Sequence, residues 1–411
     1  MRVISSTNRR AVQRIIDRDH IIDDVVKRRV VRIINDVRRH GDRAVHKYAR
    51  SLDRLSGPIE VTAAEIKRGA RETPPAVRAA IRQAARHIRR VATKQQPKHW
   101  KMSVVPGVVI EQRVTPLDRV GCYVPGGRYP LPSSLLMTAI PARVAGVTEI
   151  IAACPNPDPV VLAAAAEARV SRLVRIGGAH AIAAMAYGTA TIPKVDKIVG
   201  PGNAYVATAK AYVAPDCPID FYAGPTEIVM VANTGNPTWF AADLIAQAEH
   251  DPDARAILLT SRARFGRTVA AAVDAQLADY PTARPALRRH GVIVITRSMS
   301  EAIDLANEIA PEHAVCDQLS VATKLTKAGT VFVGPYAAQA TGDYATGSNH
   351  VLPTSGGARV RGGLSASDFV RVSSVQRLTR RGLRHLAPSV ITLANAEGLR
   401  AHAASVAIRL K

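Results

Sequence analysis

Two adjacent residues, Glu312 and His313, have the types needed to move protons. They follow Pro311, which prevents the preceding helix, expected over residues 298–309, from continuing. Successive side chains point about 100° apart on a helix and to opposite faces on a strand, whereas on an irregular turn both could face one substrate. A carboxylate beside an imidazole would then supply two proton acceptors. Taken alone, such a pair is more often a solvated helix end.

A second group of polar residues has the types that bind metals. Gln247 and His250 stand three residues apart, so on a helix they share a face, and an amide oxygen with an imidazole nitrogen is a workable ligand pair. The glycine-rich segment 342–350 adds Asp343 and His350, and its glycines permit close approach of the backbone to a ligand. Each feature also has a plainer interpretation, as a polar helix end or a surface loop. From the residues alone, the sequence allows a His/Asp/Gln metal site and no more.

The composition is that of a globular protein with two or three domains. The chain has 411 residues, of which 47% are hydrophobic, and no apolar run reaches the roughly 18 residues of a membrane span. The N-terminal segment lacks the apolar core of a signal peptide, so we expect a cytoplasmic protein that does not associate with a membrane. The four cysteines are far apart and form no C-x-x-C pattern, which argues against a disulfide framework or a zinc knuckle.

The net charge of +23 is concentrated at the two ends of the chain. Residues 1–100 contain 25 Lys and Arg against 10 Asp and Glu, residues 359–411 contain 10 against 2, and the segment between them holds 21 of each. A basic balance is typical of nucleic-acid-binding proteins. Here the arginines recur at helical spacing without interleaved aromatic residues, and the glycine-rich middle that would hold the chemistry is neutral. We therefore interpret the charge as solvated helix faces and expect no nucleic-acid partner.

The elements that would position these residues alternate along the chain. Apolar residues at helical spacing predict amphipathic helices over 8–50 and 61–95, with a break at Gly41. From residue 100 onward, short strands ending in glycine turns alternate with helices, which predicts parallel sheets covered by helices. Helical material is expected again over 367–374 and 389–408. No G-x-G-x-x-G pattern is present, so the residues themselves do not predict a dinucleotide.

Seven segments, taken together, resemble the histidinol dehydrogenase family. They occur in the order of that family and close to its spacing, from about residue 100 to the C-terminus. The segments are VGCYVPGGRYPLPSS (120–134), GPGN (200–203), AGPTE (223–227), QAEH (247–250), APEH (310–313), GDY (342–344) with NHVLPT (349–354), and AEGL (396–399) with His402.

The resemblance implies a zinc- and NAD-dependent dehydrogenase. Its activity would be the four-electron oxidation of L-histidinol to L-histidine through L-histidinal, the final steps of histidine biosynthesis. Glu312 and His313 match the catalytic pair, with His313 as the base in both oxidations and Glu312 activating water in the second. One zinc ion per subunit and NAD would be the cofactors.

The resemblance also implies ligands and contacts. The zinc ligands would be Gln247, His250, Asp343 and, from the partner subunit, His402. The residues contacting L-histidinol would be these four together with Thr226, His313, His350 and Glu397, the last again from the partner subunit. The residues contacting NAD would be Tyr123, His180 and Asn203.

The chain departs from the family's pattern at three places. His180 stands where glutamine is usual, and Thr226 replaces the common serine. The segment between His313 and Gly329 is short, with alanine and valine after the histidine where leucine is usual.

The resemblance and the alternation of elements together predict an α/β fold of two lobes. Each lobe would contain an incomplete Rossmann-like parallel sheet flanked by helices, and helical N- and C-terminal extensions would intertwine in a homodimer whose subunits share the active sites. The expected boundaries are 1–20 for the N-terminal extension, 21–122 with 226–364 for the catalytic lobe, 123–225 for the cofactor lobe, and 365–411 for the C-terminal extension.

Two other functions stay open at this point. A relative with the same fold and zinc site could oxidise a different amino alcohol or a diol. Glu397 and His350, which would touch the imidazole or the amine of the substrate, favour histidinol over that alternative. The other alternative is a basic nucleic-acid-binding protein on a retired enzyme scaffold, and the intact set of ligand positions argues against it.

Overall fold

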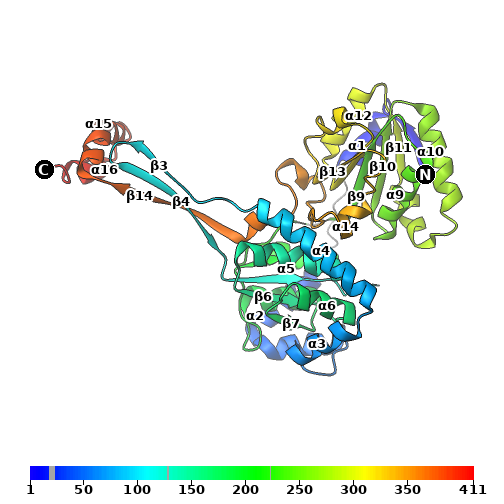
Figure 1. Ribbon diagram of the computed structural model, residues 1–411, viewed down its shortest axis with the longest axis horizontal. Coiled ribbons are helices and arrows are strands. Elements are labelled where there is room, and N and C mark those ends of the chain that lie inside the picture. Colours follow the sequence, from blue (N-terminus) through cyan, green and yellow to red (C-terminus); the bar gives the residue numbers. More distant parts are fainter. Residues whose placement is uncertain (18–23, 127–128, 223) are drawn as a thin grey trace.

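Two α/β lobes and a long arm make up the structure (Figure 1), a computed structural model that describes residues 1–17, 24–126, 129–222 and 224–411. The expected boundary between residues 20 and 21 lies outside the described residues. So do Gly127, Arg128 and Ala223, which belong to the segments that resemble the family.

The six-stranded lobe is built on a fully parallel sheet. Its strands lie in the order β1 (Arg2–Ser5), β11 (Val292–Ile295), β10 (Arg255–Thr260), β9 (Glu227–Val231), β12 (His313–Cys316) and β13 (Thr330–Val333). Its helices are α1 (Arg9–Asp17), α9 (Pro237–Glu249), α10 (Ala263–Gln276), α11 (Arg284–His290), α12 (Met299–Ile309), α13 (Leu319–Ala322) and α14 (Ala340–Tyr344). Because successive strand residues face opposite sides, the sheet has two apolar faces. One is covered by α9, α10 and α11, and the other by α1, α12 and α13.

The five-stranded lobe has a mixed sheet. Its strands lie in the order β2 (Glu60–Val61), β7 (Arg172–Val174), β6 (Glu149–Ala153), β5 (Arg119–Tyr123) and β8 (Lys197–Val199), and only β2 is antiparallel. The helices on one face are α2 (Asp24–Leu52), α7 (Gly178–Tyr187) and α8 (Ala204–Val213), and those on the other are α3 (Ala63–Glu72), α4 (Pro75–Lys94), α5 (Pro132–Ala145) and α6 (Pro159–Glu167). The break predicted at Gly41 is confirmed as a kink in α2, where φ is 50° and ψ is −131°.

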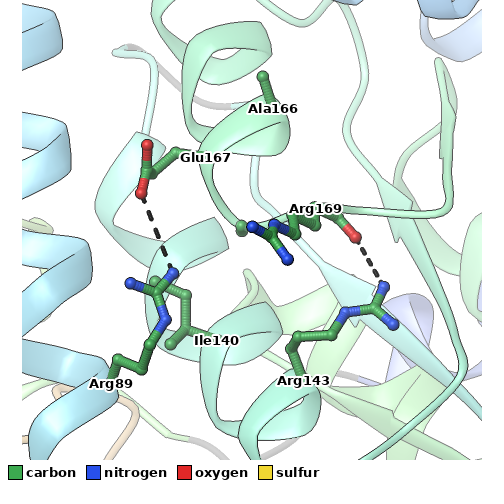
Figure 2. A pocket seen from close by; sticks show the side chains of 7 residues that line it. Arg89, Ile140, Arg143, Ala166, Glu167 and Arg169 are labelled. Atoms are coloured by element: carbon green, nitrogen blue, oxygen red, sulfur yellow. Dashed lines mark hydrogen bonds and ion pairs between the residues drawn. The ribbon is translucent and has the colours of Figure 1, made fainter.

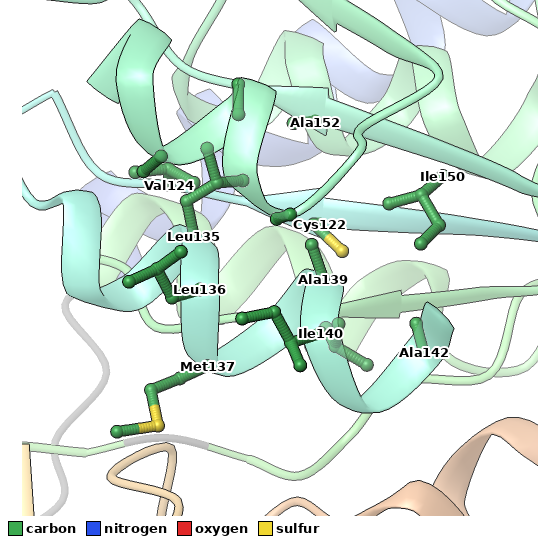
Figure 3. Packing of buried hydrophobic residues seen from close by; sticks show 14 of the residues in the cluster. Cys122, Val124, Leu135, Leu136, Met137, Ala139, Ile140, Ala142, Ile150 and Ala152 are labelled. Carbon is green, nitrogen blue, oxygen red and sulfur yellow. The ribbon is translucent and has the colours of Figure 1, made fainter. Parts of the chain in front are cut away.

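Helix α5 is buried against this sheet over most of its length, from Ser134 to Ala142. Leu135 and Ile140 pack with Cys122 and Ile150 in one cluster (Figure 3). All four cysteines are free and buried, and burial raises the pKa of the Cys122 thiol to about 12. The four cysteines are therefore packing residues.

A three-stranded antiparallel sheet forms the arm. Its strands are β3 (Trp100–Val105), β4 (Val108–Pro116) and β14 (Val370–Leu378), and it carries α15 (Arg380–Ala396) and α16 (Arg400–Ala407) at its tip, away from both lobes (Figure 1). Large apolar side chains are exposed along it, including Trp100, Met102, Val104 and Val372. An apolar surface of this kind is typical of a protein–protein interface.

The sheets group the chain differently from the boundaries expected from the sequence. Helices α2, α3 and α4 lie within the segment 21–122, yet their apolar faces pack on the five-stranded sheet, to which β2 and β5 also belong. The N-terminal segment is no separate extension, because β1 pairs with β11 at the edge of the six-stranded sheet. Apolar periodicity shows which face of a helix is buried and not which sheet covers it.

A strand replaces part of the helix expected in the C-terminal segment. Residues 367–374 are predicted to be helical, whereas β14 spans Val370–Leu378 and pairs with β4. Val370 and Val372 follow the alternation typical of strands, and their branched side chains favour extended backbone. Farther on, α15 and α16 confirm helical structure over most of 389–408. In the described ranges, no helix is long and apolar enough to cross a membrane.

Candidate active site

The edge of the six-stranded sheet at which β9 and β12 begin holds Glu312 and His313. Helix α12 is capped by Ala310 in the left-handed region, with φ of 49°, and Pro311 then stops the helix. Strand β12 begins at His313, so Glu312 lies on the bend before the strand and His313 is the first residue of the strand. Ligands of parallel sheets usually bind at the carboxyl ends of strands, whereas this group lies at the amino ends.

Glu312 is 6% exposed and its Oε2 accepts two hydrogen bonds. Thr226 Oγ1 donates at 2.5 Å and the backbone N–H of Glu227 at 3.0 Å. Gln247 Nε2 in turn donates to Thr226 Oγ1 at 2.6 Å, so one chain of hydrogen bonds joins the amide to the carboxyl group. Burial raises the pKa of Glu312 to about 7, although both donated bonds favour the ionised form. Such a carboxyl group can exchange a proton with water at neutral pH.

The hydrogen bond made by the His313 ring determines which of its two nitrogens carries the proton. Nδ1 lies 3.2 Å from the carbonyl oxygen of Glu227, and because a carbonyl only accepts, Nδ1 carries the proton. Nε2 is therefore the basic nitrogen, and it lies 4.0 Å from Asp343 Oδ1. Burial lowers the pKa of His313 and so favours the neutral ring. His313 can thus accept a proton at Nε2.

Donors suited to a metal ion lie beside this pair. His250 Nε2 is 3.9 Å from Asp343 Oδ2, and the His250 side chain is 48% exposed. Gln247 is buried, and because its Nε2 bonds to Thr226, its Oε1 has no hydrogen-bond partner. A buried polar atom without a partner is costly, and a cation would satisfy this oxygen. Nitrogen and oxygen donors are ligands that zinc accepts.

One chain supplies only part of a ligand set. Among the residues that the structure describes, no three His, Cys, Asp or Glu side chains are grouped so as to hold a metal ion. The group here contains one imidazole, one carboxylate and one amide, and tetrahedral zinc needs a fourth donor. Gln339 Nε2 donates to Asp343 Oδ2 at 2.9 Å and so orients the carboxylate.

His350 lies on the loop that follows α14, the short helix that contains Asp343. Its Nδ1 donates to the backbone oxygen of Asp343 at 2.9 Å, which leaves Nε2 as an acceptor. The side chain is 13% exposed, and burial lowers the pKa of its imidazole. His350 can therefore accept a hydrogen bond from a ligand beside the metal donors.

Glu397 and His402 lie apart from this group within one chain. Glu397 follows α15 and His402 belongs to α16, so both are at the tip of the arm (Figure 1). Both residues are exposed. The fold of a single chain therefore brings together Thr226, Gln247, His250, Glu312, His313, Asp343 and His350, and leaves these two outside.

The three residues expected to contact NAD lie in the five-stranded lobe, at the carboxyl ends of parallel strands where dinucleotides commonly bind. Tyr123 is the last residue of β5, and its hydroxyl accepts the N–H of Gly178 at 3.0 Å. His180 is fully buried in α7, with Nε2 2.8 Å from Asp53 Oδ2. Asn203 is exposed and caps α8. Of the three, only Asn203 presents its side chain to solvent.

A cavity of about 490 Å³ between α4, α5 and α6 contains none of the residues predicted for the site (Figure 2). Arg143 donates to the backbone oxygens of Val147 at 2.8 Å and Arg169 at 2.6 Å, and Arg89 lies 3.9 Å from Glu167. Arg143 thus satisfies carbonyl groups just past the ends of α5 and α6, and Arg89 pairs with the carboxylate at the end of α6. Their role is therefore in helix packing.

Similarity to known proteins identifies the family of this chain. The family model for histidinol dehydrogenase matches residues 16–410. The histidinol dehydrogenases of Geobacter metallireducens and Rhizobium meliloti are 44% and 46% identical over 401 and 392 residues, covering 94% and 92% of this chain and 92% and 90% of theirs. The chain belongs to the histidinol dehydrogenase family.

A solved structure of a histidinol dehydrogenase, from Elizabethkingia anophelis, has the same fold, with a TM-score of 0.94 at 32% identity over 100% of this chain and 98% of that one. Lactaldehyde dehydrogenase from Escherichia coli, with a TM-score of 0.50 at 12% identity over 84% of this chain and 92% of that one, shares the fold alone. The resemblance found in the seven segments is confirmed, and membership gives the chain a dehydrogenase role in histidine biosynthesis.

Two further polar residues, Glu227 and Gln339, support the candidate site, and neither was predicted as a site residue. Gln339 orients Asp343 from one helical turn away. The buried Glu227 carboxylate pairs with Arg255 at 3.2 Å and accepts the N–H of Ser355 at 3.1 Å, while its backbone bonds both members of the pair 312–313. Glu227 belongs to AGPTE, one of the seven segments that resemble the family, so the sequence could have indicated it as a site residue. Gln339 stands in no such segment.

Proposed function

We propose that this enzyme oxidises L-histidinol to L-histidine through L-histidinal, with NAD as the hydride acceptor in both steps and one zinc ion per subunit. Family membership supplies the dehydrogenase role. The observation that carries the finer proposal is the hydrogen-bond chain from Gln247 through Thr226 to Glu312. It joins a candidate metal ligand to a buried carboxyl group next to a histidine base.

The proposed zinc ligands are Gln247, His250, Asp343 and His402 of the partner subunit. The unpartnered Oε1 of Gln247 and the approach of His250 to Asp343 support the first three. When bound, zinc would hold the imidazole and the amine of histidinol. The further substrate contacts proposed are Thr226, His313, His350 and the partner subunit's Glu397.

In the first oxidation, His313 is the base. Its Nε2 accepts the hydroxyl proton while the hydrogen on the carbon leaves as hydride, so the alcohol gives an aldehyde, NADH and one proton. The bond from Nδ1 to the Glu227 carbonyl supports this role because it fixes the tautomer with a basic Nε2.

In the second oxidation, Glu312 activates water. Its carboxylate takes one proton from water as the oxygen adds to the aldehyde carbon, and the hydrate then loses a hydride to a second NAD and its hydroxyl proton to His313. The products are the carboxylate, NADH and protons. The pKa of about 7 supports this role, because the group can both accept and release a proton near neutral pH.

For NAD we propose the carboxyl edge of the five-stranded sheet. Asn203 is exposed there at the start of α8, where a helix N-terminus favours phosphate. Tyr123 and His180 would act from behind the turn at Gly177 and Gly178. The Tyr123 hydroxyl binds the second N–H of that turn, and Asp53, the partner of His180, binds the first.

We also propose a homodimer in which the arms are exchanged. The arm holds exposed apolar residues and carries Glu397 and His402 away from the site of its own chain. A partner's arm would deliver both residues and complete the ligand set. The cytoplasmic location expected from the sequence stays a prediction.

The test of this function is to incubate the zinc-loaded protein with L-histidinol and NAD and to follow NADH absorbance. We expect two NADH for each histidinol consumed, with histidine as the product. Turnover of another amino alcohol, without a signal from histidinol, would refute the substrate. One NADH per histidinol, with aldehyde accumulating, would refute the two-step reaction.

A further inference from the structure

Helix α5 contains Pro141 in its interior, and a side chain from another segment bonds to the carbonyl that this proline leaves without a helical donor. Pro141 has no N–H, so the carbonyl of Met137, four residues earlier, receives no bond from it in the helical pattern. Asn349 Nδ2 donates to that carbonyl at 2.7 Å, in a buried position. A side chain from the loop after α14 therefore bonds to a helix carbonyl that the proline leaves available.

Asn349 is fixed at both ends of its amide. It is 8% exposed, and its Oδ1 accepts the backbone N–H of Val351 at 2.9 Å. It precedes His350, and Asp343 lies six residues earlier, near the end of α14. The bond to Met137 thus ties the segment that carries both site residues to the five-stranded lobe.

A second contact joins the same loop to the same lobe. His87 of α4 lies with Nδ1 2.6 Å from the backbone oxygen of Ala345. Gly347, with φ of 89°, lies so close to the backbone of His87 that a Cβ would come within 2.5 Å of it. The loop is therefore attached to α4 and α5, while Gln247, His250, Glu312 and His313 belong to the six-stranded lobe.

We infer that the hydrogen bond from Asn349 to the carbonyl left available by Pro141 positions the segment 343–350 between the two lobes. Asn349 is a positioning residue: both ends of its side-chain amide are bonded within the chain, and it acts through Asp343 and His350. The consequence for catalysis rests on the proposed function, because hydride must pass from a substrate held at the six-stranded lobe to a cofactor held at the other. A small displacement of such groups lowers rate steeply.

The pair of residues allows the positioning role to be separated from stability. In Asn349→Ala, the Met137 carbonyl loses its donor, so we expect a lower Tm, faster amide exchange over 345–350 and a kcat lower by roughly 10²-fold, with a smaller change in KM. In the double variant with Pro141→Ala, the restored N–H at 141 can satisfy that carbonyl. We expect Tm to recover while exchange stays fast and kcat stays low.

Pro141→Ala alone is the matched control and gives the baseline for removing the proline. Recovery of kcat together with Tm in the double variant would overturn the inference, because Asn349 would then act through stability alone. Wild-type kcat and exchange in Asn349→Ala would overturn it as well. Hydrogen exchange also separates this inference from the proposed function, since the loop's protection can be measured even if the protein does not oxidise histidinol.

Discussion

Burial raises the pKa of Glu312 to about 7 in the folded protein, from the ordinary carboxyl value of 4.5 that applies to the unfolded chain. The folded state therefore binds the proton more tightly than the unfolded state. The resulting stabilisation is complete below pH 4.5 and is lost as the pH rises through 7. Glu312→Gln removes this titration, so we expect it to raise Tm relative to wild type by more at pH 8 than at pH 5. Thermal unfolding at pH 5 and pH 8 measures this, and the same difference in Tm at both pH values would contradict a raised pKa for Glu312.

The same substitution separates the two oxidations. Without the carboxylate, water is not activated, so the rate with L-histidinal should fall by roughly 10²–10⁴-fold, while oxidation of the alcohol continues. His313→Asn should instead slow both hydride steps. Single-turnover NADH formation from each substrate distinguishes the two variants. Equal losses in both steps for Glu312→Gln would contradict its role as the water activator.

Zinc content tests the ligand set independently of rate. His250→Asn removes a nitrogen donor beside Asp343, so we expect the variant to lose most of its zinc on dialysis. His350→Asn is a matched control, since this histidine bonds to the Asp343 backbone and is not a proposed ligand. Metal analysis of both proteins decides the point. Unchanged zinc in His250→Asn would remove His250 from the ligand set.

Several elements were predictable from sequence because their signals are local. The alternation of strands and helices predicted from residue 100 onward is present, for example in the strands 149–153, 197–199 and 330–333 and the helix 204–213. Each of these is a short apolar run next to a glycine turn or a clear helical period. The lobe to which α2 belongs was not predictable, because its periodic face would fit either sheet. The site residues were found through segments in a family order. Their contacts, such as Gln247 with Thr226, depend on elements far apart in the chain.

The loop that follows α14 offers a test of packing at the level of one element. Gly347 and Gly334 have nearly the same φ, 89° and 91°, but a Cβ at 347 would meet the backbone of α4, whereas a Cβ at 334 would meet nothing within 4 Å. Gly334→Ala should therefore cost about 1–2 kcal/mol, from its backbone conformation alone. Gly347→Ala should cost more and should also lower kcat, because the clash moves the loop that carries His350 and adjoins Asp343 at the end of α14. Denaturant unfolding and kinetics of both variants measure this. Equal losses of stability would show that the backbone of α4 shifts to accommodate the added Cβ.

The molecule as a whole has a projecting arm whose exposed apolar surface is not covered by any other part of the described chain. Its arm projects from the lobes with apolar residues exposed on β3 and β14 (Figure 1), and isolated extensions of this kind are stabilised by burial against another surface. The sequence indicated a C-terminal extension through its resemblance to the family, but it did not indicate the sheet, because β14 pairs with β4 across more than 250 residues of chain. Pairing over such a separation leaves no local signal.

Mixing inactive subunits tests whether the arms complete each other's sites. His313→Asn damages the site on its own lobes, and His402→Asn damages the site that its arm would reach, so each homodimer should be nearly inactive. In a heterodimer formed by unfolding and refolding the two together, the lobes of the His402 variant would meet the intact arm of the His313 variant, which restores one site of two. Because random pairing makes half of the dimers heterodimers, we expect about a quarter of wild-type activity. If each subunit held a complete site, every dimer would contain only damaged sites, and the mixture would stay as inactive as its components.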